Sequence, residues 1–402
     1  MAIFVYIMFF LLLSVCLLLA GYLTVNVFYL FVSAVAGRFG RADDVPITVA
    51  VDQLRRIAVL IPAYKEDAVI LGSVVTNLQQ SYPANLYDLI VIADSFQPET
   101  LTKLSQYPIK VLPVQFEQST VQKSISYALN ALPENTYAIV LISDADNHMA
   151  PDFLMRINQA FRQGWKAVQG HRTAKNTNTS VAVFDAINEE INNNIFRGGQ
   201  RALGLSASLI GSGMAFEPTI MKQALQQIQT VGGYDKELEM LLAVAGIKIG
   251  YLQNAVILDE KVQNIAVFQR QRTRWVAAQL YFIKAYFKIG IQQLFKGNWQ
   301  AFNTLIKSLL LPRMILLAVL CLLAVVSLLG TVSFQVFALG LLGLLLCSLI
   351  ISVPASLYHK IKGRDFVVLP SLIFGMFRSL VNYKQAGKKF LHTPHAETSD
   401  PH

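Results

Sequence analysis

Uninterrupted apolar stretches occupy both ends of the chain, and short apolar runs alternate with polar segments between them. Residues 1–37 contain no Asp, Glu, Lys or Arg, and they exceed the about 20 residues with which a helix crosses a bilayer. A signal peptide would carry a basic N-terminal region and a shorter apolar core. We therefore expect an uncleaved membrane anchor over 1–37, formed either as one span or as a tight two-helix hairpin.

Apolar stretches return near the C-terminus. Segments 309–329 and 336–353 are each long enough to span a bilayer, whereas segment 366–380 is shorter and contains a proline, a glycine and an arginine. A crossing at 366–380 would move the lysines that follow it to the outer side, against the positive-inside rule. We therefore predict two spans within 309–353, an interfacial or re-entrant segment over 366–390, and a disordered tail over 391–402.

From residue 55 onward, β-branched runs alternate with amphipathic segments, which is the pattern of a mostly parallel α/β sheet. Apolar runs at 57–61, 89–93, 109–114 and 137–142 predict strands. Several of these strands end in polar side chains, namely Tyr64 and Glu66, Asp94, and then Asp144 and Asp146. Because ligands bind beyond the carboxyl ends of strands in such sheets, we expect a nucleotide pocket there. No G-x-G-x-x-G follows the first strand, so the pocket is not of the usual dinucleotide type.

Asp144 and Asp146 are separated by a single alanine directly after a buried strand. In an extended D-x-D both side chains point to the same face. One Mg²⁺ or Mn²⁺ would then be held there, with a substrate diphosphate supplying further oxygen ligands. The alternative is a strand-end turn followed by a helix cap, since Asp favours both positions.

The composition indicates a membrane protein. Hydrophobic residues make up 54% and charged residues 15% of the chain, and its mean hydropathy is +0.45, which is too apolar for an ordinary soluble protein. The net charge is +9, yet the basic residues flank apolar segments, which predicts contact with anionic lipid and no nucleic-acid partner. Arg38 and Arg41 place the end of the anchor in the cytoplasm. The three cysteines lie in apolar runs and match no metal or disulfide pattern.

Five short motifs follow one another within residues 55–275. They are P-A-Y-K-E-D at 62–67, A-D-S at 93–95, S-D-A-D at 143–146, G-S-G-M at 211–214 and Q-R-T-R-W at 271–275. In this order they resemble the motifs of membrane-integrated family 2 glycosyltransferases, the branch that includes cellulose, hyaluronan and poly-N-acetylglucosamine synthases. The resemblance implies a cytoplasmic GT-A domain over 55–275, which is an α/β Rossmann-like nucleotide-diphospho-sugar transferase fold with a mixed, mostly parallel sheet. Amphipathic interfacial helices would follow over 276–306.

The same resemblance assigns roles to individual residues. A UDP-sugar donor would be bound by Pro62, Tyr64, Glu66, Asp94, Lys123, Asp144, Gln271 and Arg274. The Mg²⁺ or Mn²⁺ would be held chiefly by Asp146, together with Asp144. The acceptor would meet Gly211, Ser212, Gly213, Met214 and Trp275. Arginine suits bidentate phosphate contacts, and a tryptophan ring suits the face of a sugar.

The catalytic base of the family lies in an E-D dipeptide upstream of an Ala-Gly pair. Counting back from Ala245-Gly246 reaches Asp235, where the Glu of the dipeptide is replaced by Tyr234. Glu237 is the nearest competitor for this role. A purely structural alternative also exists, because acidic residues at a helix N-terminus offset the helix dipole.

These features predict an inverting, membrane-bound hexosyltransferase of the bacterial inner membrane with a cytoplasmic catalytic domain. A sugar would pass from a UDP-sugar to a hydroxyl of a growing polysaccharide or a lipid-linked acceptor, with a carboxylate accepting the hydroxyl proton. Q-x-x-R-W favours processive synthesis, and three spans offer so little channel wall that a homo-oligomer or an export partner is expected. The alternatives are single addition onto a membrane lipid and, in another class, a catalytically inactive scaffold or nucleotide sensor.

Overall fold

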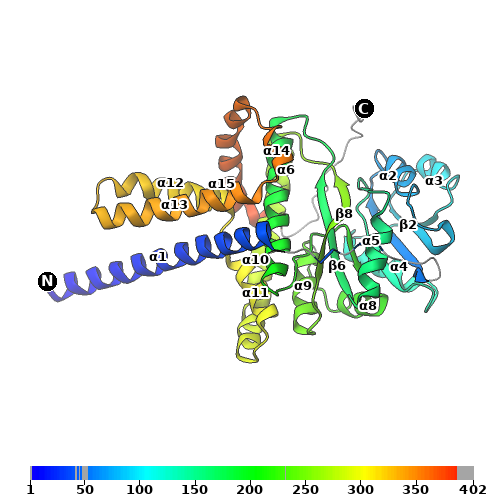
Figure 1. The fold of residues 1–402 in the computed structure, drawn as a ribbon, viewed down its shortest axis with the longest axis horizontal. Helices are drawn as coiled ribbons and strands as arrows, with labels where there is room; N and C mark the ends of the chain where they lie inside the picture. The colour runs from blue at the N-terminus through cyan, green and yellow to red at the C-terminus, as the bar shows by residue number, and fades with distance from the viewer. Residues whose placement is uncertain (1, 41–42, 45, 48–52, 231, 387–402) are drawn as a thin grey trace.

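The computed structural model describes residues 2–40, 43–44, 46–47, 53–230 and 232–386. Figure 1 shows a sheet with its covering helices at one end of the molecule. From it, α1 (Ala2–Phe39), α12 (Arg313–Ser327) and α13 (Val332–Ser352) extend side by side in nearly the same direction. The expected tail over 391–402 lies outside the described residues.

One sheet of eight strands forms the centre of the α/β region, in the order β3-β2-β1-β4-β7-β6-β8-β5. The strands are β1 (Ile57–Tyr64), β2 (Tyr87–Asp94), β3 (Lys110–Val114), β4 (Ile139–Ile142), β5 (His148–Met149), β6 (Ala167–Ala174), β7 (Met214–Phe216) and β8 (Gly250–Asp259). The first four are parallel, β7 runs antiparallel between β4 and β6, and β6 and β8 are parallel. The expectation of a mixed, mostly parallel sheet is confirmed.

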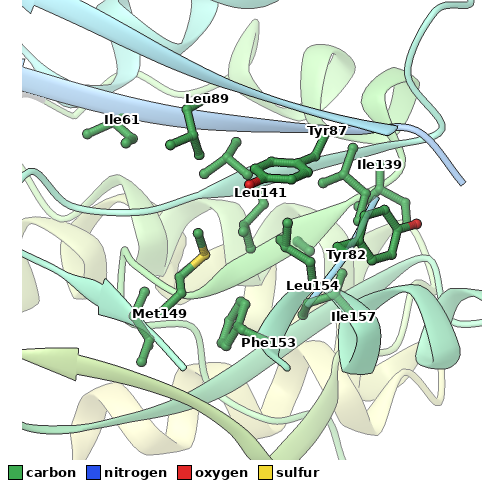
Figure 2. Packing of buried hydrophobic residues seen from close by; sticks show 14 of the residues in the cluster. Ile61, Tyr82, Tyr87, Leu89, Ile139, Leu141, Met149, Phe153, Leu154 and Ile157 are labelled. Carbon is green, nitrogen blue, oxygen red and sulfur yellow. The ribbon is translucent and has the colours of Figure 1, made fainter. Parts of the chain in front are cut away.

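The central strands are buried on both faces, which explains why they read as continuous apolar runs. On one face Ile61, Leu89 and Leu141 pack with Phe153 and Leu154 of α5 (Phe153–Arg162), as Figure 2 shows. The alternate residues of the same strands pack on the opposite face against α4 (Val121–Ala131), α8 (Pro218–Leu225) and α9 (Tyr234–Val244). Side chains of a strand alternate between faces, so a single strand supplies both cores.

The remaining helices connect or cover these elements. They are α2 (Ile70–Asn77), η2 (Ala84–Leu86), α3 (Pro98–Leu104), α6 (Ser180–Asn192), η3 (Asn193–Gly198), α7 (Gly199–Ala202), α10 (Ile265–Phe295), α11 (Trp299–Leu309), α14 (Ala355–Tyr358), η4 (Gly363–Val368) and α15 (Leu369–Ala386). Helices α4, α6, α10 and α11 begin at side-chain caps: Thr120, Thr179, Asn264 and Asn298 each accept a hydrogen bond from a backbone N–H in the first turn.

In the described part of the chain, three helices are long and apolar enough to cross a membrane, or four if one bent pair counts as a span. The first is α1, a single helix, so the two-helix hairpin is not formed. The bent pair is α11 and α12, which meet at 60° at Pro312 because proline cannot continue a helix. The third long segment, Gly363–Tyr383, includes α15, which lies across the direction of α1, α12 and α13 (Figure 1).

The amphipathic region differs from the expected range 276–306. Its first helix, α10, begins at Ile265, so the Q-x-x-R-W motif lies within the helix rather than before it. A break at Gly297, whose φ of +75° suits glycine, separates α10 from α11. Helix α10 also packs along α15, which joins the two segments proposed for the membrane interface.

Candidate active site

The carboxyl edge of the parallel strands gathers the polar residues that were expected there. Tyr64 of β1 pairs with Asp94 of β2 in the ladder, and Leu60 of β1 pairs with Ile142 of β4. The D-x-D at 144–146 therefore follows β4 at the edge where β1 and β2 end. Three separate strands deliver aromatic and acidic side chains to one edge of the sheet.

Asp94 is fully buried at the end of β2. Its Oδ1 accepts a hydrogen bond of 2.9 Å from the hydroxyl of Ser95, whereas its Oδ2 has no hydrogen-bond partner among the described residues. A buried carboxylate oxygen without a donor is costly and calls for a ligand or water. Lys65 and Ser95, which follow β1 and β2, have left-handed φ values of 55° and 59°, and such strained residues concentrate at functional sites.

The D-x-D segment forms a turn, so the expectation of an extended D-x-D is wrong. The N–H of Asn147 donates to the carbonyl oxygen of Asp144 over 3.1 Å. Strand β4 ends at Ile142, before the acidic pair, because Asp and Asn stabilise turns through their own side chains. The strand-end turn that the sequence analysis kept as an alternative is the conformation found.

The two acidic side chains differ in exposure. The side chain of Asp144 is 38% exposed and lies 3.9 Å from the guanidinium of Arg172. Asp146 is buried, with Oδ1 accepting from the amide of Asn147 at 3.1 Å and Oδ2 accepting from the N–H of Glu260 at 3.3 Å. Asp144 is therefore the more accessible carboxylate, and Asp146 is fixed in place by its donors.

The donor set fits a hard divalent cation that is bound together with a substrate. Across the described ranges, no group of three or more His, Cys, Asp or Glu side chains could hold an ion. An ion at the D-x-D turn would thus have Asp144 and Asp146 as protein ligands and take its other oxygens from a diphosphate and water. Mg²⁺ is typically bound in this way, through one or two carboxylates plus phosphates.

The glycine loop at 211–213 lies directly behind the D-x-D turn. Gly211 and Gly213 have φ values of +86° and +64°, which explains the glycines at both positions. Ser212 is fully buried, and its hydroxyl accepts a hydrogen bond of 2.9 Å from the N–H of Asp144 and donates to Asn147. Met214 is buried in the core cluster. Ser212 and Met214 thus hold the loop in position, and only the glycine backbone is free to approach a ligand.

A buried cluster of charged side chains lies beside the turn, and the sequence analysis missed it. It comprises Arg172 of β6, Asp185 and Glu189 of α6, Arg197 of η3, Asp259 and Lys261 at the end of β8, and Arg272 of α10. Arg172 lies 3.1 Å from Glu189 and 3.7 Å from Asp259, and Lys261 lies 2.6 Å from Asp259. Asp259 ends a strand as Asp94 does, which is the signal that could have revealed it.

The electrostatics of this ion cluster favour its charged state. Burial alone would raise the pKa of Asp259, but Arg172 and Lys261 outweigh burial and hold that pKa well below its usual range. Glu189 behaves in the same way, with its pKa lowered by Arg172, Lys261 and Arg197 against the effect of burial. The cluster therefore remains a set of paired ions at neutral pH, next to the place where a diphosphate would bind.

Helix α9 begins with the residues that were considered for the catalytic base. The hydroxyl of Tyr234 donates to the carbonyl oxygen of Gly211 over 2.9 Å, which ties the start of α9 to the glycine loop. The pKa of Tyr234 is raised by burial and further by the charges of Asp144 and Asp235. Tyr234 therefore lies within electrostatic reach of both carboxylates, and Asp235 lies within electrostatic reach of Arg172, the neighbour of Asp144.

Asp235 and Glu237 differ in how they are engaged. Glu237 is buried, and its Oε2 accepts hydrogen bonds of 3.0 Å from the N–H groups of both Gln229 and Thr230. Asp235 is only partly buried, and desolvation raises its pKa, opposed by Lys236. A carboxylate with a raised pKa is a stronger base, whereas Glu237 is occupied in holding the preceding loop.

The Q-x-x-R-W motif reaches the ion cluster through its central arginine. Arg272 forms an ion pair with Asp185, and its guanidinium packs 4.0 Å from the centre of the Trp275 ring. Trp275 itself is 38% exposed. The Oε1 of Gln271 is buried without a hydrogen-bond partner in the described residues, and burial together with Arg270 lowers the pKa of Arg274. The motif thus combines an exposed ring with a buried Gln271 oxygen that has no hydrogen-bond donor among the described residues.

The other donor-site candidates also lie at the carboxyl edge. Pro62 and Tyr64 end β1, and the ammonium of Lys65 lies 5.3 Å above the Tyr64 ring. Glu66 follows and is buried. Lys123 lies in the first turn of α4, where its ammonium donates to the carbonyl oxygen of Gln118 over 2.8 Å.

Comparison with known proteins shows to which family the region that contains these residues belongs. The family model described as "Glycosyltransferase like family 2" matches residues 55–278, more than half of the chain. The chain belongs to this family. The matched region contains the sheet, the D-x-D turn, the ion cluster, the start of α9 and the Q-x-x-R-W motif. The candidate site thus lies within the region that matches the family.

Relatives of this chain are identical to it at about a quarter or fewer of the aligned residues. A probable glycosyltransferase, YdaM of Bacillus subtilis (strain 168), is 24% identical over 255 residues, which are 59% of each chain. An N-acetylglucosaminyltransferase of Rhizobium leguminosarum bv. viciae is 22% identical over 238 residues, 54% of each chain. The chain thus matches less than two thirds of these relatives' lengths.

The fold of the glycosyltransferase also occurs in a solved structure. The mannosyltransferase PcManGT from Pyrobaculum calidifontis, in complex with GDP-Man and Mn²⁺, superposes with a TM-score of 0.53 at 17% sequence identity. The superposition covers 91% of this chain and 97% of the mannosyltransferase. The shared GT-A architecture confirms the fold class that the sequence predicted.

Proposed function

We propose that this glycosyltransferase moves a sugar from a UDP-sugar to a hydroxyl of a growing glycan or lipid-linked acceptor, with inversion at the anomeric carbon. The observation that carries the proposal is the position of Asp235. It lies in the first turn of α9, which Tyr234 ties to Gly211, and it is within electrostatic reach of Arg172, whose guanidinium lies 3.9 Å from Asp144. Its competitor Glu237 is engaged by two backbone N–H groups.

The nucleotide would bind at the ends of β1 and β2. The Oδ2 of Asp94 is buried without a donor in the described part of the chain, and the imide N–H of a uracil base is a donor that fits this acceptor. Tyr64 would pack on the base, with Glu66 beside it, and the N-terminal turn of α4 would bring Lys123 to the phosphate side. The N-acetylglucosaminyltransferase names of the relatives support an amino-sugar nucleotide as the donor.

A divalent cation would neutralise the charge that develops on the leaving diphosphate. Asp146, held by Asn147 and by the N–H of Glu260, and the more exposed Asp144 would be its protein ligands. The Pyrobaculum mannosyltransferase forms its complex with GDP-Man and Mn²⁺, which supports a divalent cation in this fold. Gln271 and Arg274 would contact the diphosphate from the side of α10.

The transfer step itself uses Asp235 as a general base. The acceptor hydroxyl attacks the anomeric carbon, its proton passes to the carboxylate of Asp235, and UDP leaves with the electrons of the broken C–O bond. Because one base and a direct displacement are involved, the anomeric configuration inverts. The pKa of Asp235, raised by burial, brings its basicity closer to that of the group it must deprotonate.

The acceptor would reach this base along the membrane surface. Helices α1, α12 and α13 would cross the bilayer, while α15 lies across their direction in Figure 1 and would lie in the interface. The α12–α13 turn lies at the end farthest from the sheet. Arg38, in the last turn of α1, would place the opposite end and the catalytic domain on the cytoplasmic side by the positive-inside rule. Trp275 would stack on the acceptor sugar. For processive synthesis, three crossing helices would need an export partner or further copies of the chain.

Two conservative variants test the base. Asp235→Asn preserves shape but cannot accept a proton, so transfer should fall by about 10²–10⁴, the usual contribution of general-base catalysis. UDP affinity measured by calorimetry should be unchanged. Glu237→Gln is the matched control and should lower stability while leaving turnover within a few fold. A large loss in Glu237→Gln, with normal transfer by Asp235→Asn, would assign the base to Glu237.

The donor and the product length can be determined together. Purified protein in lipid would receive a panel of labelled UDP- and GDP-sugars, and the products would be sized. We expect turnover of one UDP-sugar and a long polymer as product. A single added sugar would show single addition onto a membrane lipid, and no turnover of any donor would indicate a scaffold or sensor.

A further inference from the structure

An ion pair between Lys307 and Glu239 connects α11, which leads into the proposed membrane helix α12, to the helix that carries Asp235. Glu239 lies on α9 and Lys307 on α11, and both side chains are only 7% exposed. Helix α11 continues through a 60° bend into α12. The pair is therefore a buried connection between the membrane part of the protein and the proposed catalytic helix.

The same pair also holds the segment that leads into the glycine loop. The ammonium of Lys307 donates to the hydroxyl of Ser208 over 2.8 Å, and the Oε2 of Glu239 accepts from the N–H of Leu209 over 3.2 Å. Thr304 of α11 adds a hydroxyl at 3.4 Å from Glu239 Oε1. Two residues farther along the chain, Gly211 begins the loop. Three elements thus meet at this one pair.

Glu239 follows Asp235 by one helical turn. Side chains four residues apart on a helix are neighbours, and the charge of Glu239 acts on Asp235 in the direction that raises its pKa. The other charged groups that act on Asp235 are Lys236, on its own helix, and Arg172 of the ion cluster. Burial and the charge of Glu237, rather than that of Asp235, raise the pKa values of Tyr281 and Tyr286 of α10.

We propose that Lys307 and Glu239 are positioning residues that hold α9 and the glycine loop in register with the membrane-entering helix and balance the charge beside Asp235. The inference rests on the proposed role of Asp235 as the base. With both partners present, the pair is neutral. Removing either one leaves a single buried charge whose sign differs between the two cases, and this provides a test that a merely structural contact would not pass.

The experiment measures the pH dependence of kcat/KM in lipid nanodiscs. Loss of the negative charge in Glu239→Gln should move the acid limb to lower pH, and loss of the positive charge in Lys307→Met should move it to higher pH. Each shift should be about one pH unit, the scale for one charge acting over this separation. The double variant should return close to the wild-type limb, and Lys307→Arg should retain it.

Lys288→Met is the matched control, because Lys288 is an exposed lysine of α10 and its removal changes the net charge equally. Its acid limb should not move. UDP binding measured by calorimetry confirms that each variant is folded. If Lys307→Met does not fold, the result for Glu239→Gln decides alone. An acid limb of Glu239→Gln that is unshifted or moves to higher pH overturns the proposal. Shifts of the same sign in both single variants also overturn it. Normal transfer by Asp235→Asn would instead refute the base itself, whatever the pair does.

Discussion

Asp259, at the end of β8, and Lys261, two residues later, form an ion pair of 2.6 Å in the protein interior. Arg172 lies 3.7 Å from the same carboxylate, and Asn147 donates to it over 3.0 Å. Because Asn147 also closes the D-x-D turn, the ion cluster and the turn support each other. Because this pairing lowers the pKa of Asp259 in the folded protein, the free energy of unfolding depends on pH.

The first prediction concerns this pH dependence. The pKa of Asp259 is lower in the folded protein than the about 3.9 of an unfolded Asp, so its stabilisation is complete above that value and is lost as the pH falls towards the folded pKa. Asp259→Asn should cost about 3–5 kcal/mol at pH 7, as breaking a buried pair does. The difference from wild type should shrink as the pH falls below about 4.

Denaturant unfolding in detergent at a series of pH values measures this difference. Glu134→Gln, which removes an exposed acidic residue, is the control and should be neutral at every pH. A stability difference for Asp259→Asn that stays constant down to about pH 3, below the usual pKa of Asp, would show that the pairing does not depend on the charge of Asp259.

The second prediction concerns the metal. Turnover should require Mg²⁺ or Mn²⁺, and Asp146→Asn should weaken Mn²⁺ binding in the presence of UDP, observed directly by electron paramagnetic resonance. Asp144→Asn should weaken it as well, because the turn offers only these two carboxylates. Asp152→Asn alters a nearby acidic residue outside the turn and should bind Mn²⁺ normally. Full activity in excess EDTA would refute the metal assignment.

The third prediction concerns the acceptor side. Trp275→Ala removes an exposed ring beside Arg272, and transfer should fall by about 10-fold or more, since one aromatic stacking contact contributes about 0.5–1.5 kcal/mol and the exclusion of water adds to it. Trp275→Phe, which retains an aromatic face, should recover part of the activity. UDP affinity should stay nearly intact in both variants. An equal loss of UDP affinity would place Trp275 in the donor site.

The fourth prediction concerns topology. In a background without Cys16, Cys321 and Cys347, a single cysteine introduced at Thr398 should react with an impermeant reagent only from the cytoplasmic side. Helix α15 lies across the direction of α1, α12 and α13 in Figure 1, and its proposed place in the interface predicts that position 398 is on the side of the catalytic domain. A cysteine at Thr331, in the α12–α13 turn, is the control and should react from outside. Outside labelling at Thr398 would mean that Gly363–Tyr383 crosses the membrane.

The sequence by itself determined the class of sheet, the strands β1, β2 and β4 and the family. These features depend on local information: two-sided burial makes a parallel strand read as a continuous apolar run, and an acidic residue after such a run marks the ligand edge. Asp94 and the D-x-D were therefore identifiable, as was the apolar length of α1. The order of the motifs indicated the family, because motif order can be read from the sequence without a structure.

Only the tertiary structure decided which charges meet. Arg172 pairs with Glu189, and Glu239 with Lys307, and nothing local distinguishes these residues from the exposed charges of other helices. The sequence left an extended D-x-D and a strand-end turn both open, and in the folded protein Ser212, far along the chain, accepts a hydrogen bond from the backbone of Asp144 in the turn. Helix α15 lies across α12 and α13 because it packs along α10. These features depend on contacts between segments that are distant in the sequence. Such contacts form, and stabilise the protein, only in the folded chain.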